Sequence, residues 1–597
     1  MCSPLRRFTG DPLQDDENLR KGEQLWNGYS SKKRIMKDQP SSAAPSGQGQ
    51  PATLPVNYTS PSGYKWKVLS TVVFGIFMII LDTTVVNVAF QTLREDFGGS
   101  LNDSQWIISI YVLALGISTP LAGFLANRFG AKKIYLGGLG LFAFGSMLCG
   151  LSPSLTLLIA ARALQGIGGG IAAPLGIALL LQAFPPKEQG MALGLFGIAA
   201  LVAPAIGPIL GGWLVDLNLW RVIFFINPPI GLIGVLLGSR FLREHESADK
   251  PPFDLVGVVT EIIGFAAILY AASIVADRGW TSPTTLTWFA VGAVGLIVFG
   301  VVELFVAKAP LLDLRLFRNR IFLNASLLGY VSTIALFGAE FLMPVYLQSL
   351  RGRTALETGF ILLPMALTGG ICVTLSGRMY DKVGPRPLMV GGFAILMVNT
   401  WQLSQIQADT SIGWIIFLLA LRGLALGLTV QTTMVTALSV VTRRDLARGS
   451  SLTNATRLVF QSIGVAVLAT VLASTISPEV QALENQLSEG LRSASGRVAG
   501  LCEPVPVAWA GVASARNGRS FSDVANKSAR QGQGPTEPPQ MGDMLQRACR
   551  ENIAGFERAY SLTFYLAFVA LLLGIMLPGW PAKWVGRQVM EATISPH

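Results

Sequence analysis

Histidine is almost absent from this chain: its 597 residues include two, His245 and His597. A histidine-based metal centre or catalytic triad is therefore not expected, because such sites need histidine beside further ligands or beside a nucleophile. The phosphate-binding pattern G-x-x-x-x-G-K-[ST] is also missing, so the chain lacks this loop for ATP. The sequence predicts no enzyme, no metal and no cofactor, and any energy that the protein uses would come from an ion gradient.

Charged residues are also scarce, at 14% of the chain, whereas hydrophobic residues reach 51% and the mean hydropathy is +0.50. Soluble domains usually carry roughly 25% charged residues. So apolar and so long a chain is typical of many membrane spans rather than of one large core. The net charge of +11 would suit nucleic acid, but the basic residues lie between apolar segments, as in cytoplasmic loops that face anionic lipid. No nucleic-acid partner is expected.

The long apolar segments predict an all-α membrane protein with about fourteen transmembrane helices. Each segment approaches the ~20 residues that cross a bilayer as a helix. The segments lie near 67–91, 104–126, 134–152, 154–183, 190–215, 220–241, 254–276, 284–306, 321–348, 356–377, 387–405, 411–440, 451–476 and 558–580.

A short turn rich in Gly, Lys and Arg occurs twice between apolar segments, at 123–133 and again at 377–386. Glycines let the chain bend and basic residues favour the cytoplasmic face, so each turn is expected to join two membrane helices there. The repeat predicts two related six-helix halves, an architecture typical of secondary transporters. The candidate gating residues are Gly123, Asn127, Arg128, Gly130, Lys132, Lys133, Gly377, Asp381, Lys382, Gly384 and Arg386.

Loop charge predicts the orientation. Lys and Arg gather in one set of short loops, which includes both turns, so both termini are expected in the cytoplasm. No apolar core follows the first arginines, so the start does not resemble a signal peptide. The expected parts are a disordered cytoplasmic tail at 1–64, six-helix bundles at 65–242 and 321–580, an inserted helix pair at 253–306, a long outer loop at 477–556 and a cytoplasmic tail at 581–597.

The long loop contains Cys502 and Cys549. An exported loop is exposed to oxidation, so the two are candidates for a disulfide. The alternative is two unpaired thiols.

Charges within the spans are the sharpest functional signal, because a charge in the bilayer is costly unless it is paired or hydrated. Asp82 in span 1 and Arg162 in span 4 are expected at roughly one depth, and Glu340 and Arg422 repeat this arrangement in the second half. An acid that exchanges an arginine partner for a proton would couple transport to a proton gradient. The alternative is a static buried ion pair that fixes helix packing.

Span 5 combines prolines with glycines. A proline removes a backbone hydrogen bond and bends the helix, whereas glycines let another helix pack closely. The span is therefore a candidate hinge, and the alternative is tight packing without motion. Its residues of interest are Pro204, Gly207, Pro208, Gly211 and Gly212.

Taken together, these motifs resemble the major facilitator superfamily, specifically its fourteen-span drug:proton antiporters. The resemblance covers roughly residues 65–580. It rests on Leu-Asp-Thr-Thr-Val-Val-Asn-Val-Ala from Leu81, the turn at Gly123, Arg162 with Gln165, the span-5 pattern from Ala203, and Trp-Arg-Val-Ile-Phe-Phe-Ile-Asn-Pro-Pro-Ile-Gly from Trp220. The family usually has Asp where this chain has Asn127, whereas the second turn keeps Asp381.

The resemblance implies export in exchange for protons, with Asp82 and Arg162 in coupling and the two turns as latches during alternating access. The expected protein is a monomer in the plasma membrane that expels amphipathic, apolar or cationic small molecules, with protons and the lipid bilayer as its other partners. Two alternatives stay open. One is a dedicated exporter of a metabolite, siderophore or antibiotic, and the other is a receptor or scaffold that does not transport.

Overall fold

The structure is a computed structural model that describes residues 63–98, 101–244, 254–307, 310–443, 445–477, 480, 502 and 538–579. The chain separates into two units, Met1–Thr59 and Ser60–His597, and every described residue belongs to the second. The expected tails at 1–64 and 581–597 lie outside the described residues, except for residues 63 and 64.

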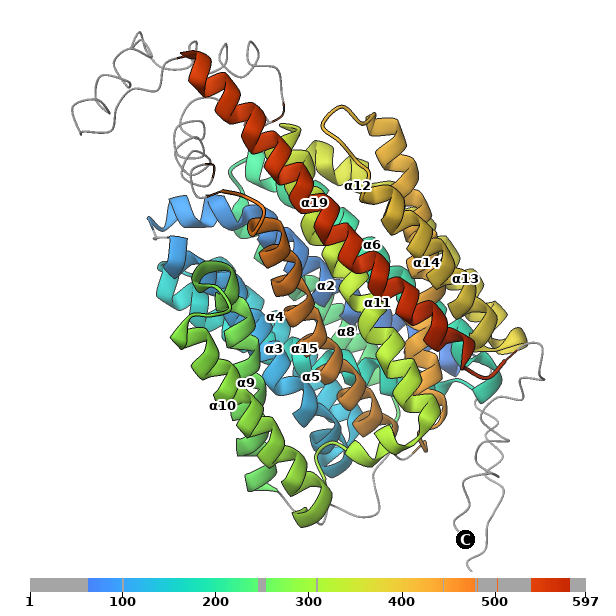
Figure 1. The fold of residues 1–597 in the computed structure, drawn as a ribbon. Helices are drawn as coiled ribbons and strands as arrows, with labels where there is room; N and C mark the ends of the chain where they lie inside the picture. Colours follow the sequence, from blue (N-terminus) through green and yellow to red (C-terminus); the bar gives the residue numbers. More distant parts are fainter. Residues whose placement is uncertain are drawn as a thin grey trace, which may run out of the picture. The chain divides into compact units, whose positions relative to one another are not determined.

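Helices make up nearly all of the described chain, and no strand occurs within it (Figure 1). Short 3₁₀ turns lie at Pro186–Glu188 and Leu314–Arg318, and π turns at Val302–Val306 and Tyr346–Leu350. The α-helices are α2 Tyr64–Asp96, α3 Leu101–Phe129, α4 Ala131–Leu151, α5 Leu155–Ala183, α6 Gln189–Asp216, α7 Trp220–Phe225, α8 Asn227–Phe241, α9 Leu255–Arg278, α10 Pro283–Val301, α11 Arg320–Val345, α12 Ala355–Val383, α13 Pro385–Leu403, α14 Ile412–Ser439, α15 Leu446–Ala473 and α19 Pro538–Ile575.

Twelve helices in the described part are long and apolar enough to cross a membrane. Two further predicted spans coincide with α11, which has a shorter apolar stretch at Arg320–Leu336, and with α13. The all-helical membrane fold is confirmed, and the expected number of about fourteen spans is approximately right.

The surface of the bundle carries large apolar side chains that a soluble protein would bury. Phe305 is 81% exposed, Ile371 70% and Ile297 66%. Lipid tails solvate such side chains without cost, and the helices satisfy their own backbone hydrogen bonds. The exposed apolar surface therefore suits a bilayer.

Helices from the two predicted halves pack against each other in two main helix pairs. In one, α6 packs against α12, and in the other α3 packs against α15. The hairpin of α9 and α10 lies at one side of the bundle, where α9 contacts both α3 and α15 (Figure 1). The long helix α19 runs along α11 and α13.

The last helix starts earlier than predicted. The sequence indicates a span near 558–580 and a loop at 477–556, but α19 begins at Pro538, about five to six turns before. The added turns are polar, so an apolar segment does not detect them. Ala548 and Asn552 on this part are nevertheless buried, and packing rather than hydropathy supports it.

Cys502 and Cys549 form a disulfide in the structure, with a Cα–Cα distance of 5.1 Å. The Cys502 backbone N–H donates to the Leu350 carbonyl at 3.0 Å. The bridge thus joins Cys549 on α19 to Cys502, which is hydrogen-bonded to the end of the π turn that follows α11.

Candidate functional site

Asp82 on α2 is the centre of a buried polar cluster. Arg162 Nη1 on α5 donates to Asp82 Oδ2 at 2.6 Å, and Gln165 Nε2 donates to Oδ1 at 2.8 Å. Asn227 Nδ2, at the start of α8, donates to the same Oδ1 at 2.7 Å. The three donors surround the carboxylate, so both of its oxygens are hydrogen-bonded, and the bond from Arg162 is charge-assisted. All four residues are at most 1% exposed.

Arg162 is held by more than the carboxylate. Its Nε donates to the Ile107 carbonyl at 3.1 Å, and its Nη1 also donates to Gln165 Oε1 at 2.8 Å. The guanidinium carbon lies 4.0 Å from the centre of the Tyr111 ring. Each buried charge thus has an opposite charge and further partners, as a buried ion pair requires.

A helix break brings Asn227 to this cluster. Pro228 has no N–H, so the Phe224 carbonyl loses its usual partner four residues later. Ser146 Oγ on α4 donates to this carbonyl at 2.8 Å, and Asn227 Nδ2 donates to Ser146 Oγ at 2.9 Å. The sixth predicted span is therefore two helices, α7 and α8. Ser146 on α4 bonds to both sides of the break and so supports the cluster.

The second predicted pair is described in part. Arg422 on α14 is fully buried, with Nη2 donating to the Ala335 carbonyl at 2.7 Å and Nη1 to Asn399 Oδ1 at 3.3 Å. Glu340 lies on α11, but its side chain is outside the described part. The proposed pairing of these two residues thus stays a prediction.

The first basic turn lies between α3 and α4. A Cβ at Gly123 would lie 2.8 Å from Arg448 Cα, so α3 and α15 touch there. Gly130 has a φ of 99° and faces Glu244, whose carboxylate accepts from the N–H groups of Lys132 at 3.1 Å and Lys133 at 3.3 Å. Glu244 caps α4, and no sequence motif points to it.

The other residues of the first turn differ in their contacts and in their exposure. Lys132 Nζ donates to the Ser239 carbonyl at 2.8 Å, and Arg128 lies over the ring of Phe129. Lys133 is exposed, and Asn127 is half-buried. The described hydrogen bonds include none from the Asn127 side chain.

The second basic turn binds the opposite half directly. Asp381 Oδ1 accepts from the Gly190 N–H at 3.0 Å, and Oδ2 from the Met191 N–H at 3.1 Å. These N–H groups lie in the first turn of α6 and have no partner within that helix. A Cβ at Gly377 would lie 2.3 Å from the Gly190 carbonyl oxygen, so the helices are in close contact. Asp381 therefore caps a helix of the other half.

Gly384 ends α12 with a φ of 80°, which glycine adopts at little cost. Lys382 is exposed and Arg386 half-buried.

Span 5 corresponds to α6, which contains Pro204 and Pro208. Gly207 faces α2, where a Cβ would lie 2.1 Å from Thr84 Oγ1, and Gly211 faces Val85 at 3.2 Å. Gly212 faces α12, with its nearest neighbour, Leu356, 3.8 Å away. The glycines thus allow α6 to pack closely on the helix that carries Asp82.

Gly207→Ala is expected to destabilise the protein by about 1–3 kcal/mol, because the new methyl group must displace Thr84, two residues from Asp82. Gly212→Ala is the matched control, since its methyl group meets only ordinary contacts. Thermal unfolding of both variants in detergent checks this difference, and equal midpoints would contradict it.

Fold and site together define a multi-pass membrane protein with a buried, hydrogen-bonded ion pair, a feature that marks transport pathways in such proteins. Residues 72–465 match the family model of the Major Facilitator Superfamily. The chain belongs to this family of transporters.

Several relatives have names that refer to drug transport. The Multidrug transporter protein MdtP of Bacillus subtilis is 32% identical over 405 residues, which cover 68% of this chain and 74% of the relative. A Multidrug resistance protein B homolog of Mycobacterium tuberculosis is 30% identical over 424 residues, covering 70% and 78%. The uncharacterized MFS-type transporter YhcA of Bacillus subtilis is 35% identical over 397 residues, covering 66% and 74%.

The fold agrees with that of a solved transporter. The crystal structure of the human organic anion transporter MFSD10 has a TM-score of 0.51 and 16% identity, and the match covers 68% of this chain and 93% of that one. At this identity, the likeness concerns the fold alone.

Proposed function

We propose that the protein is a proton-coupled antiporter that exports amphipathic small molecules by alternating access. The observation that carries the proposal is the Asp82 cluster, in which an acid within the bilayer meets an arginine and two amides. The names of two relatives refer to multidrug transport or multidrug resistance, which supports this substrate class.

Asp82 is the proposed proton carrier. In the described arrangement its carboxylate accepts three hydrogen bonds, one of them from the Arg162 guanidinium. Protonation would cancel its charge and weaken its bonds to Arg162. The arginine would then lose its counter-charge, so protonation and movement of α5 against α2 would be linked. In the second half, Glu340 and Arg422 are proposed to act in the same way.

The two basic turns are proposed as latches. Asp381 with the start of α6, and Gly123 with α15, hold the halves together at one end of the bundle. Opening that end breaks these contacts, and closing it restores them. With the turns on the cytoplasmic side, as loop charge predicts, this end faces the cytoplasm and both termini are inside. The proposed location is the plasma membrane, and the proposed unit is a monomer.

Inverted membrane vesicles test the function. A panel of amphipathic dyes is supplied outside, and a proton gradient, acid inside, is imposed. The proposal predicts that vesicles with the protein accumulate dye and that collapsing the gradient releases it. Accumulation that is unchanged without a gradient would contradict proton coupling. Movement of a single compound alone would favour a dedicated exporter.

The disulfide tests the orientation. In intact cells, a membrane-impermeant maleimide is expected to label Cys502 and Cys549 only after treatment with an impermeant reductant. Buried Cys149 should stay unlabelled in both conditions. The Cys502→Ser/Cys549→Ser variant is the control for the new label. If the reduced cysteines react only after the membrane is opened, the proposed orientation is wrong.

A further inference from the structure

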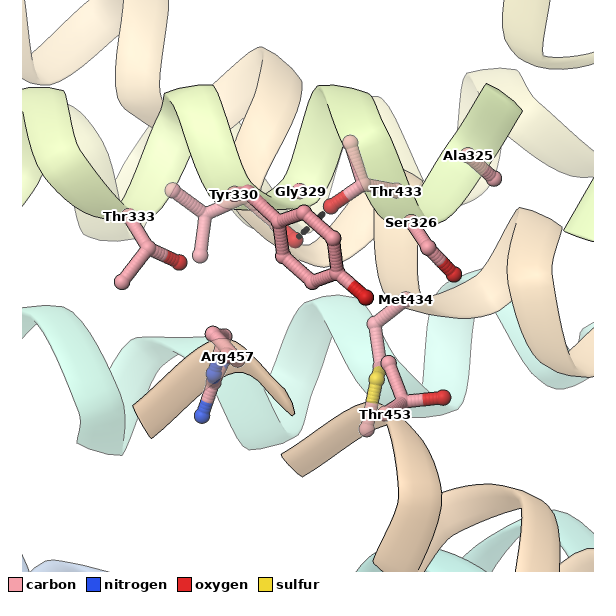
Figure 2. A pocket seen from close by; sticks show the side chains of 10 residues that line it. Ala325, Ser326, Gly329, Tyr330, Thr333, Thr433, Met434, Thr453 and Arg457 are labelled. Carbon is pink, nitrogen blue, oxygen red and sulfur yellow. Dashed lines mark hydrogen bonds between the residues drawn. The ribbon is translucent and has the colours of Figure 1, made fainter. Parts of the chain in front are cut away.

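Three helices of the second half enclose a small polar cavity (Figure 2). Its lining comes from α11, α14 and α15. The polar side chains in it are Ser326, Tyr330, Thr333, Thr433, Thr453 and Arg457. The cavity has a volume of about 10 Å³, which is room for about one water molecule.

Arg457 brings a positive charge to this cavity, and none of the described residues that line it is acidic. Its Nη2 donates to Asn454 Oδ1 at 3.2 Å, a neutral acceptor on its own helix. Within the described part of the chain it forms no ion pair, in contrast to Arg162. A guanidinium inside a membrane protein is costly without a counter-charge. The site is therefore electrostatically incomplete.

The same cavity offers an aromatic surface. The Tyr330 ring on α11 stacks on Phe460 of α15, with centroids 4.1 Å apart and an interplanar angle of 10°. In Figure 2, Tyr330 and Thr433 lie on one side of the opening and Arg457 on the other. Positive charge, hydroxyl groups and the Tyr330 ring thus line one space, a combination that suits an aromatic molecule with an anionic group.

The cavity also lies where the halves move. Helix α15 packs against α3, α5 and α9, and Ser450 Oγ, two turns before Arg457, donates to the Pro174 carbonyl on α5 at 2.8 Å. Separation of the halves during alternating access would widen the space around α15. The described cavity is too small for a substrate, so binding would require this widening.

We propose that Arg457 is the anion subsite of the transport cavity and that it binds the carboxylate or sulfonate of an amphipathic organic anion or zwitterion. This inference rests on the proposed function and names its substrate class. The guanidinium would bind the anionic group in a bidentate fashion, and the Tyr330 ring would contact the apolar part. A lipophilic cation without an anionic group would meet repulsion instead, so the charge of Arg457 selects against it.

Two dyes that differ at one group test the inference. Rhodamine B has a free carboxylate, and its ethyl ester is the same molecule without it. Binding of each to the purified full-length protein in detergent is measured by fluorescence polarisation, with empty micelles as the blank. The wild type is expected to bind the acid at least about tenfold more tightly than the ester.

Arg457→Gln is expected to remove this preference, while Arg457→Lys keeps the charge and should retain part of it. Arg278→Gln, on an exposed residue at the end of α9, is the control and should bind like the wild type. Unchanged preference in Arg457→Gln would overturn the inference, as would equal binding of acid and ester by the wild type. Folding of each variant is checked by its elution as a single monodisperse species.

Binding in detergent needs no gradient, so this claim fails separately from proton coupling. Asp82→Asn is expected to keep the preference for the acid while it loses gradient-driven transport. If the wild type neither binds nor moves either dye, both the proposed multidrug function and the subsite that rests on it are rejected.

Discussion

Asp82→Asn is expected to reduce gradient-driven dye accumulation to the background of vesicles that lack the protein. The amide has nearly the shape of the carboxyl group, but it does not bind and release a proton near neutral pH. It still accepts a hydrogen bond, yet it leaves Arg162 without its counter-charge. The variant therefore removes the proposed proton carrier with little change of volume.

Loss of activity alone does not separate coupling from damage, because a buried charge left without its partner destabilises by about 3–5 kcal/mol. The double variant Asp82→Asn/Arg162→Gln removes both charges and is expected to recover stability. If the pair only fixes helix packing, the double variant recovers transport too. If Asp82 carries the proton, transport stays at background.

Asp96→Asn is the matched control for Asp82→Asn. It makes the same change on the same helix, at a residue whose side chain is 49% exposed. Transport close to that of the wild type is expected. Full proton-dependent transport by Asp82→Asn would contradict the assigned role.

Asp381→Ala is expected to shift the balance of the halves toward the conformation in which their contact at the turns is open. Two N–H groups of α6 lose their acceptor, and the favourable charge at the helix start is removed. Loss of such a cap costs about 1–2 kcal/mol, which is roughly a 5- to 30-fold change in the equilibrium. The transport rate should fall because the closed state is less populated.

Spin labels at Lys187 and Lys382, two exposed positions beside this contact, report the change as a longer distance distribution. The background lacks the three cysteines other than Cys502 and Cys549, which are Cys2, Cys149 and Cys372. Asn127→Ala is the matched control at the equivalent place in the first turn, where no side-chain hydrogen bond is described. A smaller effect is expected there, and equal effects of the two variants would mean that Asp381 is not the stronger latch.

Sequence reasoning predicted those parts of the site that depend on depth in the membrane. Asp82 and Arg162 were expected at one level of the bilayer because rise per residue is fixed in a helix, and the structure brings them within 2.6 Å. The repeated turn likewise indicated where helices meet, although not which N–H groups Asp381 accepts from. Those lie 190 and 191 residues away, on α6.

The missed residues are neutral or depend on local breaks. Asn227 and Ser146 enter the Asp82 cluster because Pro228 interrupts span 6, and a hydropathy pattern shows a continuous segment there. The sequence pattern does not single out Arg457, because its helix resembles one more apolar span and the cavity beside it is formed by three helices together. The role of these residues depends on contacts between helices, which the sequence pattern of a single segment does not show.

Proton movement measured together with substrate movement tests the central claim most directly. Purified protein is reconstituted in liposomes with a pH-sensitive dye inside, and a concentration gradient of substrate is imposed without a proton gradient. Antiport predicts that substrate entering the liposome drives protons out, so the interior becomes alkaline, and that Asp82→Asn removes this signal. Substrate entry by the wild type with no change of internal pH would contradict the account.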